Sequence, residues 1–320
     1  MWSNHIEHFC ARKMALYGAA SLRIGYGIAG TAYYLRNYSD RHFLWGPDGV
    51  YPLDSLQHYI LRPGFSIYEW AASQLVFEVL FHSGIVVGVL FCLGIGGRFA
   101  TVAHYVFLVS LFLRNPALLD GGDNLAYMVL LYLIPVDTTA VLSVGRLRKD
   151  AKTPRISTVL HNTGVVLIAM QVFVVYLASA MFKIQGRLWQ DGTAMYYILR
   201  VPEFSWPLVT DHVIRYAWLI VISTYFAVLF QLLFPVLIAI RETRVVAIVL
   251  AILFHGAIGI FMGLTSFSIY MIATEAIFLS DRHYRRLGVR VDRLLDRVWG
   301  RSTRAMERIC ERRLAETKTK

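Results

Sequence analysis

The sequence predicts an all-α fold: a polytopic membrane helix bundle of about eight transmembrane helices with both termini in the cytoplasm. The first observation is composition, since 57% of the 320 residues are hydrophobic and only 17% are charged. Soluble domains average about 25% charged and 45–50% apolar residues. The second observation is that the apolar residues gather in long runs, and the third is that Lys and Arg concentrate between alternate runs. Together they indicate a multi-pass protein with a fixed orientation in a bilayer.

Eight apolar segments support this count. A straight crossing takes about 20 residues, with a range of about 17–25, so the third, fourth and eighth segments are short for a span. The first is too long for the core of a signal peptide and has no small-residue cleavage site behind it, so we expect a retained signal anchor. The segments lie at 16–36, 72–94, 99–113, 124–136, 158–182, 216–240, 245–262 and 266–280.

Basic residues set the predicted orientation. Lys and Arg are most frequent in the loop at 146–155 and in the tail after residue 281. Cytoplasmic loops of membrane proteins carry an excess of these residues. Both regions, and with them the N-terminus, are therefore expected in the cytoplasm, which makes the number of crossings even.

Three parts follow along the chain: a cytoplasmic N-terminus at 1–15, a transmembrane domain at 16–281 and a tail at 282–320. In the tail, apolar residues such as Leu294 and Val298 recur three or four positions apart among arginines, which predicts a basic amphipathic helix on the anionic inner leaflet. Because topology accounts for the positive charge, we expect the lipid bilayer as a partner and no nucleic acid.

Three polar segments share the predicted outer face: FLWGPDGVYPLD at 43–54, RNPALLDGGDNL at 114–125, and the stretch at 183–192. Their glycines and prolines permit tight turns, so we expect polar side chains to converge over the mouth of the bundle and to form a site. The alternative is ordinary turn chemistry in hydrated loops, with Trp45 and Trp189 in an interfacial aromatic belt.

Polar side chains inside the apolar segments form a second group of candidates. Such residues face the bundle interior and pair with one another. Glu78 and His82 are one helical turn apart and share a face, which fits a proton relay or contacts to a quinone headgroup. The alternative is that they neutralise Arg23 and tie helices together. The group consists of Arg23, Glu78, His82, His104, Gln171, Gln231, His255 and Glu275.

No metal site is predicted. The three cysteines, Cys10, Cys92 and Cys310, are too few and too scattered for a thiolate site or a disulfide framework. The histidines of the apolar segments lie on different segments, without the His-x-x-x-His spacing of a helical zinc site.

The order and spacing of these segments resemble the horizontally transferred transmembrane (HTTM) domain, which vitamin K-dependent gamma-carboxylases share with many bacterial proteins. The resemblance covers roughly residues 16–281. It is carried by LRIGYGIAGTAYYLRN (22–37), WGPDGVYP (45–52), RNPALLDGGDNLAYMVLLYL (114–133), YLASAMFKIQGRLWQDGTAMYYIL (176–199) and FHGAIGIFMGLTSFSIYMIA (254–273).

The resemblance implies a bacterial inner-membrane protein. The B-type membrane protein of the sporulation-delaying toxin systems has the same domain, which implies the modification, maturation or export of a peptide or protein at the extracytoplasmic face. The implied partners are a secreted peptide precursor and a second protein of the same system.

The resemblance also implies site residues. In the carboxylases a lysine at the matching helix end acts as a base on vitamin K hydroquinone, and a base must be neutral to accept a proton. The candidate catalytic residues are Lys183, which the resemblance implies, and Asp120, Asp123, Asn124 and Asp191 of the polar outer segments. The candidates for binding a substrate or a quinone come from the polar residues of the apolar segments and from the third outer segment; they are Arg23, Glu78, His82, His255 and Trp189.

Two positions depart from the carboxylase pattern. Counting back from Trp189 without a gap puts Ile184 at the position of the carboxylase base, and Asn124-Leu125 stands where the carboxylases have Asn-His. A vitamin K- or quinone-dependent carboxylase is therefore the second interpretation, with a quinone as the cofactor that the resemblance suggests. The third is a non-enzymatic membrane subunit or a transporter, although the inverted repeats that favour transport are not visible. Whether the chain is an enzyme stays open at this point.

Overall fold

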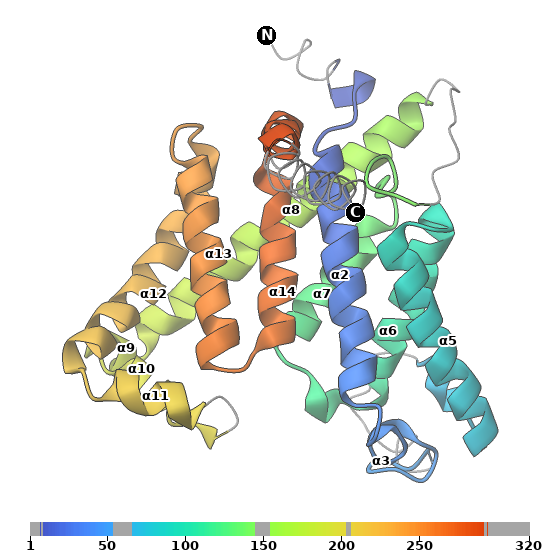
Figure 1. Ribbon diagram of the computed structural model, residues 1–320, viewed down its shortest axis with the longest axis horizontal. Coiled ribbons are helices and arrows are strands. Elements are labelled where there is room, and N and C mark those ends of the chain that lie inside the picture. Colours follow the sequence, from blue (N-terminus) through green and yellow to red (C-terminus); the bar gives the residue numbers. More distant parts are fainter. Residues whose placement is uncertain are drawn as a thin grey trace, which may run out of the picture. The chain divides into compact units, whose positions relative to one another are not determined.

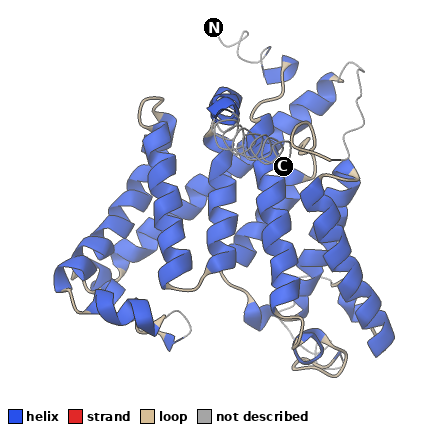
Figure 2. Cartoon of the chain, in the orientation of Figure 1, coloured by secondary structure: helices blue, strands red, loops and turns tan. Residues whose placement is uncertain are grey.

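The computed structural model describes residues 7, 9–53, 66–144, 154–202, 206–290 and 293. Within these ranges every regular element is a helix, as Figures 1 and 2 show, which confirms the predicted all-α class. The chain divides into two compact units, Met1–Phe278 and Leu279–Lys320. Each unit is described by itself.

All eight predicted segments form helices. In the described ranges, α5, α8, α12 and α13 are by themselves long and apolar enough to cross a membrane, so the number of crossings stays a prediction. The eight helices are α2 (Leu16–Arg36), α5 (Gln74–Leu93), α6 (Gly97–Arg114), α7 (Gly121–Leu133), α8 (Arg155–Gln185), α12 (Ala217–Ala239), α13 (Arg244–Phe261) and α14 (Thr265–Glu275).

Local sequence sets the ends of these helices. At the start of α5, the Ser73 side chain accepts a hydrogen bond from the Val76 amide, and the helix ends at Gly94, whose φ of 76° lies in the left-handed region that favours glycine. At the start of α7, the Asp120 carboxylate accepts hydrogen bonds from two backbone amides. Turn residues therefore divide the apolar sequence into separate helices.

Successive long helices run in opposite directions (Figure 1), so the connections of the first unit fall at two ends. We call the end where α2 ends and α5 begins the outer end, after its predicted orientation, and the opposite end the inner end. The outer end carries the short helices α3 (Arg41–Trp45), η1 (Ile67–Trp70), η2 (Pro116–Leu118), α9 (Arg187–Gln190), α10 (Ala194–Ile198) and α11 (Pro207–Ile214).

The inner end is held by polar contacts between distant parts of the chain. The Lys13 ammonium lies 2.7 Å from the Asp137 carboxylate. Burial by itself would raise the pKa of Asp137, but the hydrogen bond and the charge of Lys13 hold it below its usual value. Nearby, His161 Nε2 lies 2.7 Å from the Met14 carbonyl oxygen. These contacts connect the start of α2 to the α7–α8 connection and to α8.

Close approach of backbones positions α2 in the first unit. A Cβ atom at Gly27 would lie 2.6 Å from the Cβ atom of Cys92 on α5, and one at Gly25 would lie 2.4 Å from that of Ala273 on α14. Glycine at these two positions therefore allows α2 to pack tightly between α5 and α14.

Helix α8 changes its neighbours along its length. Near its inner end Gly164 contacts Val136, which lies three residues after the end of α7, and a Cβ atom at Gly164 would lie 2.5 Å from Val136 Cγ2. Three turns further on, Tyr176 stacks on Phe234 of α12, with ring centroids 3.9 Å apart. Figure 1 shows the corresponding oblique course of α8 across the bundle.

Large apolar side chains cover the outside of the helices. Phe99 of α6, Phe182 of α8 and Leu253 of α13 are 89%, 76% and 64% exposed. Side chains of this size on otherwise apolar helices match the hydrocarbon of a bilayer. The chain is a multi-pass membrane protein, as the sequence predicts.

The orientation of the bundle can be tested by cysteine accessibility. In a parent without Cys10, Cys92 and Cys310, a cysteine at Gln190, between α8 and α10, should react with a membrane-impermeant maleimide in intact cells. A cysteine at Glu242, between α12 and α13, should react only after permeabilisation. Labelling of position 242 in intact cells would show that the predicted orientation is wrong.

The second unit begins after α14. Residues 281–290 are helical, in agreement with the predicted helical tail at 282–320. The remainder of that prediction, including Val291, Leu294 and Val298, lies outside the described residues.

Candidate functional site

Lys183 lies in the last turn of α8, at the outer end. Its Nζ atom donates a hydrogen bond of 2.6 Å to Ser179 Oγ and lies 5.2 Å from the ring centroid of Trp189. The chain turns at Gly186, where a Cβ atom would lie 2.9 Å from Trp189 Cδ1, and α9 then brings Trp189 back beside the lysine. The amine is thus partly buried between a hydroxyl group and an aromatic ring, where a cation–π contact contributes about 0.5–2 kcal/mol.

The face of α8 on which Lys183 lies points into the bundle. Val172, Tyr176 and Ala180 are each 1% exposed or less, and Lys183 continues their spacing of three and four residues. Ile184, the neighbouring residue at the carboxylase base position, is 39% exposed on the outward side. The only amine at this helix end that faces the interior is therefore that of Lys183.

Asp191 has a surface environment. Its carboxylate lies 3.5 Å from Arg187 Nε, and the two side chains are 54% and 92% exposed. An exposed ion pair of this kind contributes little to stability. The turn itself is fixed to α12, because the Tyr225 hydroxyl donates a hydrogen bond of 2.8 Å to the Gln190 carbonyl oxygen.

Asp120 and Asp123 form a capping box at the start of α7. Asp120 Oδ1 accepts hydrogen bonds from the amides of Gly122 and Asp123 at 2.6 and 3.0 Å, and Asp123 Oδ2 accepts one from the Asp120 amide at 3.1 Å. The predicted catalytic carboxylates therefore serve first to satisfy amides that a helix start leaves unpaired. The adjacent Asn124 side chain is exposed, on a different side of α7 from buried Asp123.

Two of the three predicted outer segments meet. Arg114, at the end of α6, is 1% exposed and donates hydrogen bonds of 2.6 and 2.7 Å to the carbonyl oxygens of Tyr51 and Gly46. Asn115 Nδ2 donates one to the Leu44 carbonyl oxygen at 3.0 Å. These contacts join the first two segments, and the convergence of the third segment, with Lys183, on them stays a prediction.

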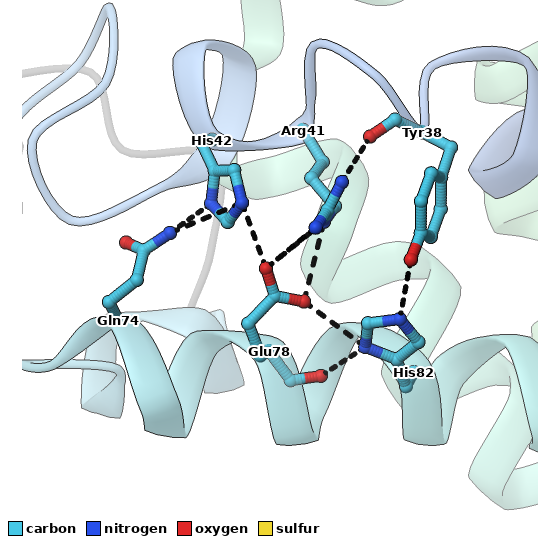
Figure 3. Close-up of polar contacts among 6 residues, drawn as sticks. All are labelled: Tyr38, Arg41, His42, Gln74, Glu78 and His82. Carbon is cyan, nitrogen blue, oxygen red and sulfur yellow. Dashed lines mark hydrogen bonds and ion pairs between the residues drawn. The ribbon is translucent and has the colours of Figure 1, made fainter.

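Glu78 is the centre of a polar network at the outer end of α5, drawn in Figure 3. Arg41 contacts both carboxylate oxygens, with Nη2 2.9 Å from Oε1 and Nε 3.3 Å from Oε2. His42 Nε2 and His82 Nδ1 lie 2.9 and 3.2 Å from the same carboxylate. Tyr38 completes the network through a hydrogen bond of 3.0 Å between its hydroxyl group and His82 Nε2. The predicted pair of Glu78 and His82 is therefore in contact.

The predicted neutralisation of Arg23 by Glu78 is wrong. Arg23 lies near the start of α2 and Glu78 near the start of α5, and these neighbours are antiparallel, so the two side chains are at opposite ends of the bundle. Arg23 donates a hydrogen bond to the Leu142 carbonyl oxygen at the inner end. The cation that neutralises Glu78 is Arg41, which lies outside the apolar segments and carried no sequence signal of its own.

A third cluster lies in the middle of the bundle, where α8, α13 and α14 meet. Tyr176, His255 and Glu275 are 1% exposed or less and contact one another at 2.5 to 3.1 Å. The sequence indicates His255 and Glu275 as polar residues on apolar helices, but nothing in it distinguishes Tyr176 from an ordinary packing residue. Within the described ranges there is no group of three or more His, Cys, Asp or Glu side chains that could hold a metal ion.

The sequence of this chain is similar to a known domain family and to two curated proteins. The HTTM domain family model matches residues 54–282. The chain is 29% identical over 218 residues to the sporulation-delaying protein SdpB of Bacillus subtilis (strain 168), a match that covers 63% of the chain and 64% of SdpB. It is 25% identical over 207 residues to the uncharacterized protein YitO of the same organism, covering 61% of the chain and 65% of YitO.

The chain therefore spans slightly less than two thirds of the length of each of these curated relatives. No solved structure matches it.

Proposed function

Because the chain belongs to the HTTM domain family, we propose that it matures a secreted peptide precursor at the extracytoplasmic face of a bacterial membrane. The proposal includes a second protein of the same system as partner. It rests on the similarity to a sporulation-delaying protein and on the match of the HTTM domain model to residues 54–282, which include the outer end of α8.

The observation that carries this proposal is the environment of Lys183. An amine held against Ser179 and Trp189 on the inward face of α8 has two chemical uses. As an ammonium ion it binds a carboxylate or carbonyl oxygen of a peptide, and as a free amine it accepts a proton from a reacting group. Both uses suit a peptide substrate that arrives at the outer end.

The carboxylase alternative is less well supported by the same helix. Its base position falls on the outward-facing Ile184, which has no proton-accepting group. The histidine of the carboxylase Asn-His pair is replaced here by the apolar Leu125. A carboxylase of this family would therefore have to use Lys183 in place of the missing base.

The proposal can be tested by co-expression. Any short secreted peptide that is encoded beside the gene for this chain, with any neighbouring soluble protein, is expressed in a heterologous bacterium with and without the chain, and the medium is analysed by mass spectrometry. We expect the mature product only when the chain is present. Identical product in its absence would contradict the proposal, and a product with an added carboxyl group on glutamate would favour the carboxylase alternative.

A further inference from the structure

Tyr176, His255 and Glu275 form a closed set of contacts inside the membrane bundle. The Tyr176 hydroxyl group donates a hydrogen bond of 2.5 Å to Glu275 Oε1 and lies 3.0 Å from His255 Nε2. His255 Nε2 is also 3.1 Å from Glu275 Oε1. In the tautomer or imidazolium form that carries a proton on Nε2, this carboxylate oxygen faces two donors, the tyrosine O–H and the imidazole Nε2–H.

The surroundings of this cluster are aromatic. Phe234 stacks on Tyr176 with centroids 3.9 Å apart, and Phe254 and Phe267 lie 5.0 and 5.6 Å from the imidazole ring. A net charge in such surroundings is costly, by several kcal/mol or more. The three side chains together are therefore expected to carry no net charge.

Neutrality requires one proton beyond those in the contacts. With tyrosine O–H and imidazole Nε2–H already donating to Glu275 Oε1, the extra proton resides on His255 Nδ1, as an imidazolium–carboxylate pair, or on Glu275 Oε2, as a neutral acid. Both of these atoms are buried and have no hydrogen-bond partner among the described residues. In either state the cluster presents one donor and one acceptor to a further group.

Small and polar side chains connect the cluster to the outer end. On α8, Ala180 lies one helical turn outward of Tyr176. On α13, Gly259 lies one helical turn outward of His255. A Cβ atom at Gly259 would lie 2.9 Å from Ser268 Oγ, so this glycine lets α14 bring Ser268 close to α13. Ser268 Oγ is itself buried without a hydrogen-bond partner in the described part of the protein.

The helix faces that carry the cluster continue towards Lys183 at the outer end. Ser268 lies seven residues outward of Glu275 on α14, and Lys183 lies seven residues outward of Tyr176 on α8. Seven residues correspond to two turns, or about 10 Å along a helix. Polar atoms thus recur from the cluster towards the outer end on two of its three helices.

We propose that Tyr176, His255 and Glu275 form an intramembrane proton-exchange site, which passes one proton to and from a hydrogen-bonding group that enters between α8, α13 and α14. The exchange runs through the neutral-acid state, in which the proton leaves Glu275 Oε2 for a lone pair on an oxygen or nitrogen atom of that group, water included. The cluster is then left with a carboxylate, which tyrosine O–H and imidazole Nε2–H stabilise by their two hydrogen bonds. The reverse step restores the neutral cluster.

A carbodiimide tests the proposal without any assay of function. Dicyclohexylcarbodiimide is apolar and reacts with protonated carboxyl groups, so it should label Glu275 of the wild-type protein in membranes at pH 7. Mass spectrometry of peptides should find this labelling at least about tenfold above that of exposed Glu242, because a carboxyl group in water is almost wholly ionised at this pH. Absence of label at Glu275 would overturn the proposal, since it needs both a proton on the carboxyl group and access to it.

Two variants separate proton exchange from a structural role. Tyr176→Phe removes one donor to the carboxylate and keeps the ring against Phe234, so labelling of Glu275 should become faster. An unchanged or slower rate in a folded Tyr176→Phe protein would count against exchange. Glu275→Gln keeps the shape and should lose the label at position 275 with an unchanged elution profile in size-exclusion chromatography. If it fails to fold, the wild-type and Tyr176→Phe measurements still decide.

Discussion

Replacing Lys183 by methionine is expected to abolish maturation of the precursor while leaving the amount of protein in the membrane unchanged. Methionine keeps an unbranched stem that packs beside Trp189 but has no amine to bind or accept a proton. Loss of a group that transfers protons lowers a rate by about 10²–10⁴-fold. The measurement is the ratio of mature to unprocessed precursor in the medium, with the variant quantified in isolated membranes.

Arginine at position 183 separates the roles that a lysine can have. An arginine stays protonated and is a poor base, so Lys183→Arg should not restore activity if the amine accepts a proton. It should restore activity if a positive charge on a long stem is enough. The matched control is Arg187→Met, which removes a nearby cation that is 92% exposed and should leave maturation unchanged.

Full activity of Lys183→Met at normal abundance would remove this residue from the site. The remaining candidates would then be Asp120, Asp123 and Asp191. Loss of the protein itself with methionine and its recovery with arginine would instead assign Lys183 to the stability of the outer end of α8.

Arg114→Met should destabilise the bundle by about 1–3 kcal/mol for each carbonyl oxygen that loses its donor. The guanidinium group is 1% exposed and holds the carbonyl oxygens of Gly46 and Tyr51, which would be left unpaired. Each buried acceptor without a donor costs about 1–3 kcal/mol. We expect a clearly lower melting temperature in detergent, measured by size-exclusion chromatography of samples after heating.

The matched control for Arg114 is Arg200→Met. Arg200 is an exposed arginine at the same end of the bundle, and it contacts only Tyr196 through its described hydrogen bond and ring contact. Its replacement should change the melting temperature little. Equal melting temperatures for the Arg114 variant and the wild type would show that the loop at 43–54 is not held by this contact.

The fold could be predicted from the sequence because each helix is marked by its own residues. The segment predicted at 16–36 has the bounds of α2, and that at 99–113 falls within α6 (Gly97–Arg114). The length of each apolar run determines how long the helix is, and residues such as Gly94 and Asp120 determine where a helix ends or begins. This information is local, so no knowledge of neighbouring helices is needed.

The contacts between side chains could be predicted only in part, because they depend on which helices become neighbours. Glu78 and His82 are on one helix, and their contact follows from the helical repeat. Arg41 is the partner of Glu78, and Tyr176 is the partner of Glu275. In each pair the two residues are many positions apart in the sequence, so no local pattern connects them. The pairing of Asp120 with Asp123 is also local, because an acidic residue three positions after a capping aspartate fits a helix start. Acidic residues in a polar segment at the mouth of a bundle fit a catalytic site equally well, so the pattern alone does not distinguish the two roles.

The oblique course of α8 makes the protein sensitive to bilayer thickness. Its 31 residues extend over about 46 Å, whereas the hydrocarbon core of a typical bilayer is about 30 Å thick. Such hydrophobic mismatch is relieved by tilt. We therefore expect a thinner membrane to increase the tilt of α8 and to move its Lys183 end away from the Asp120 end of α7, and a thicker membrane to bring the two ends together. The lipid composition of the host membrane thus helps to set the distance between the two polar ends.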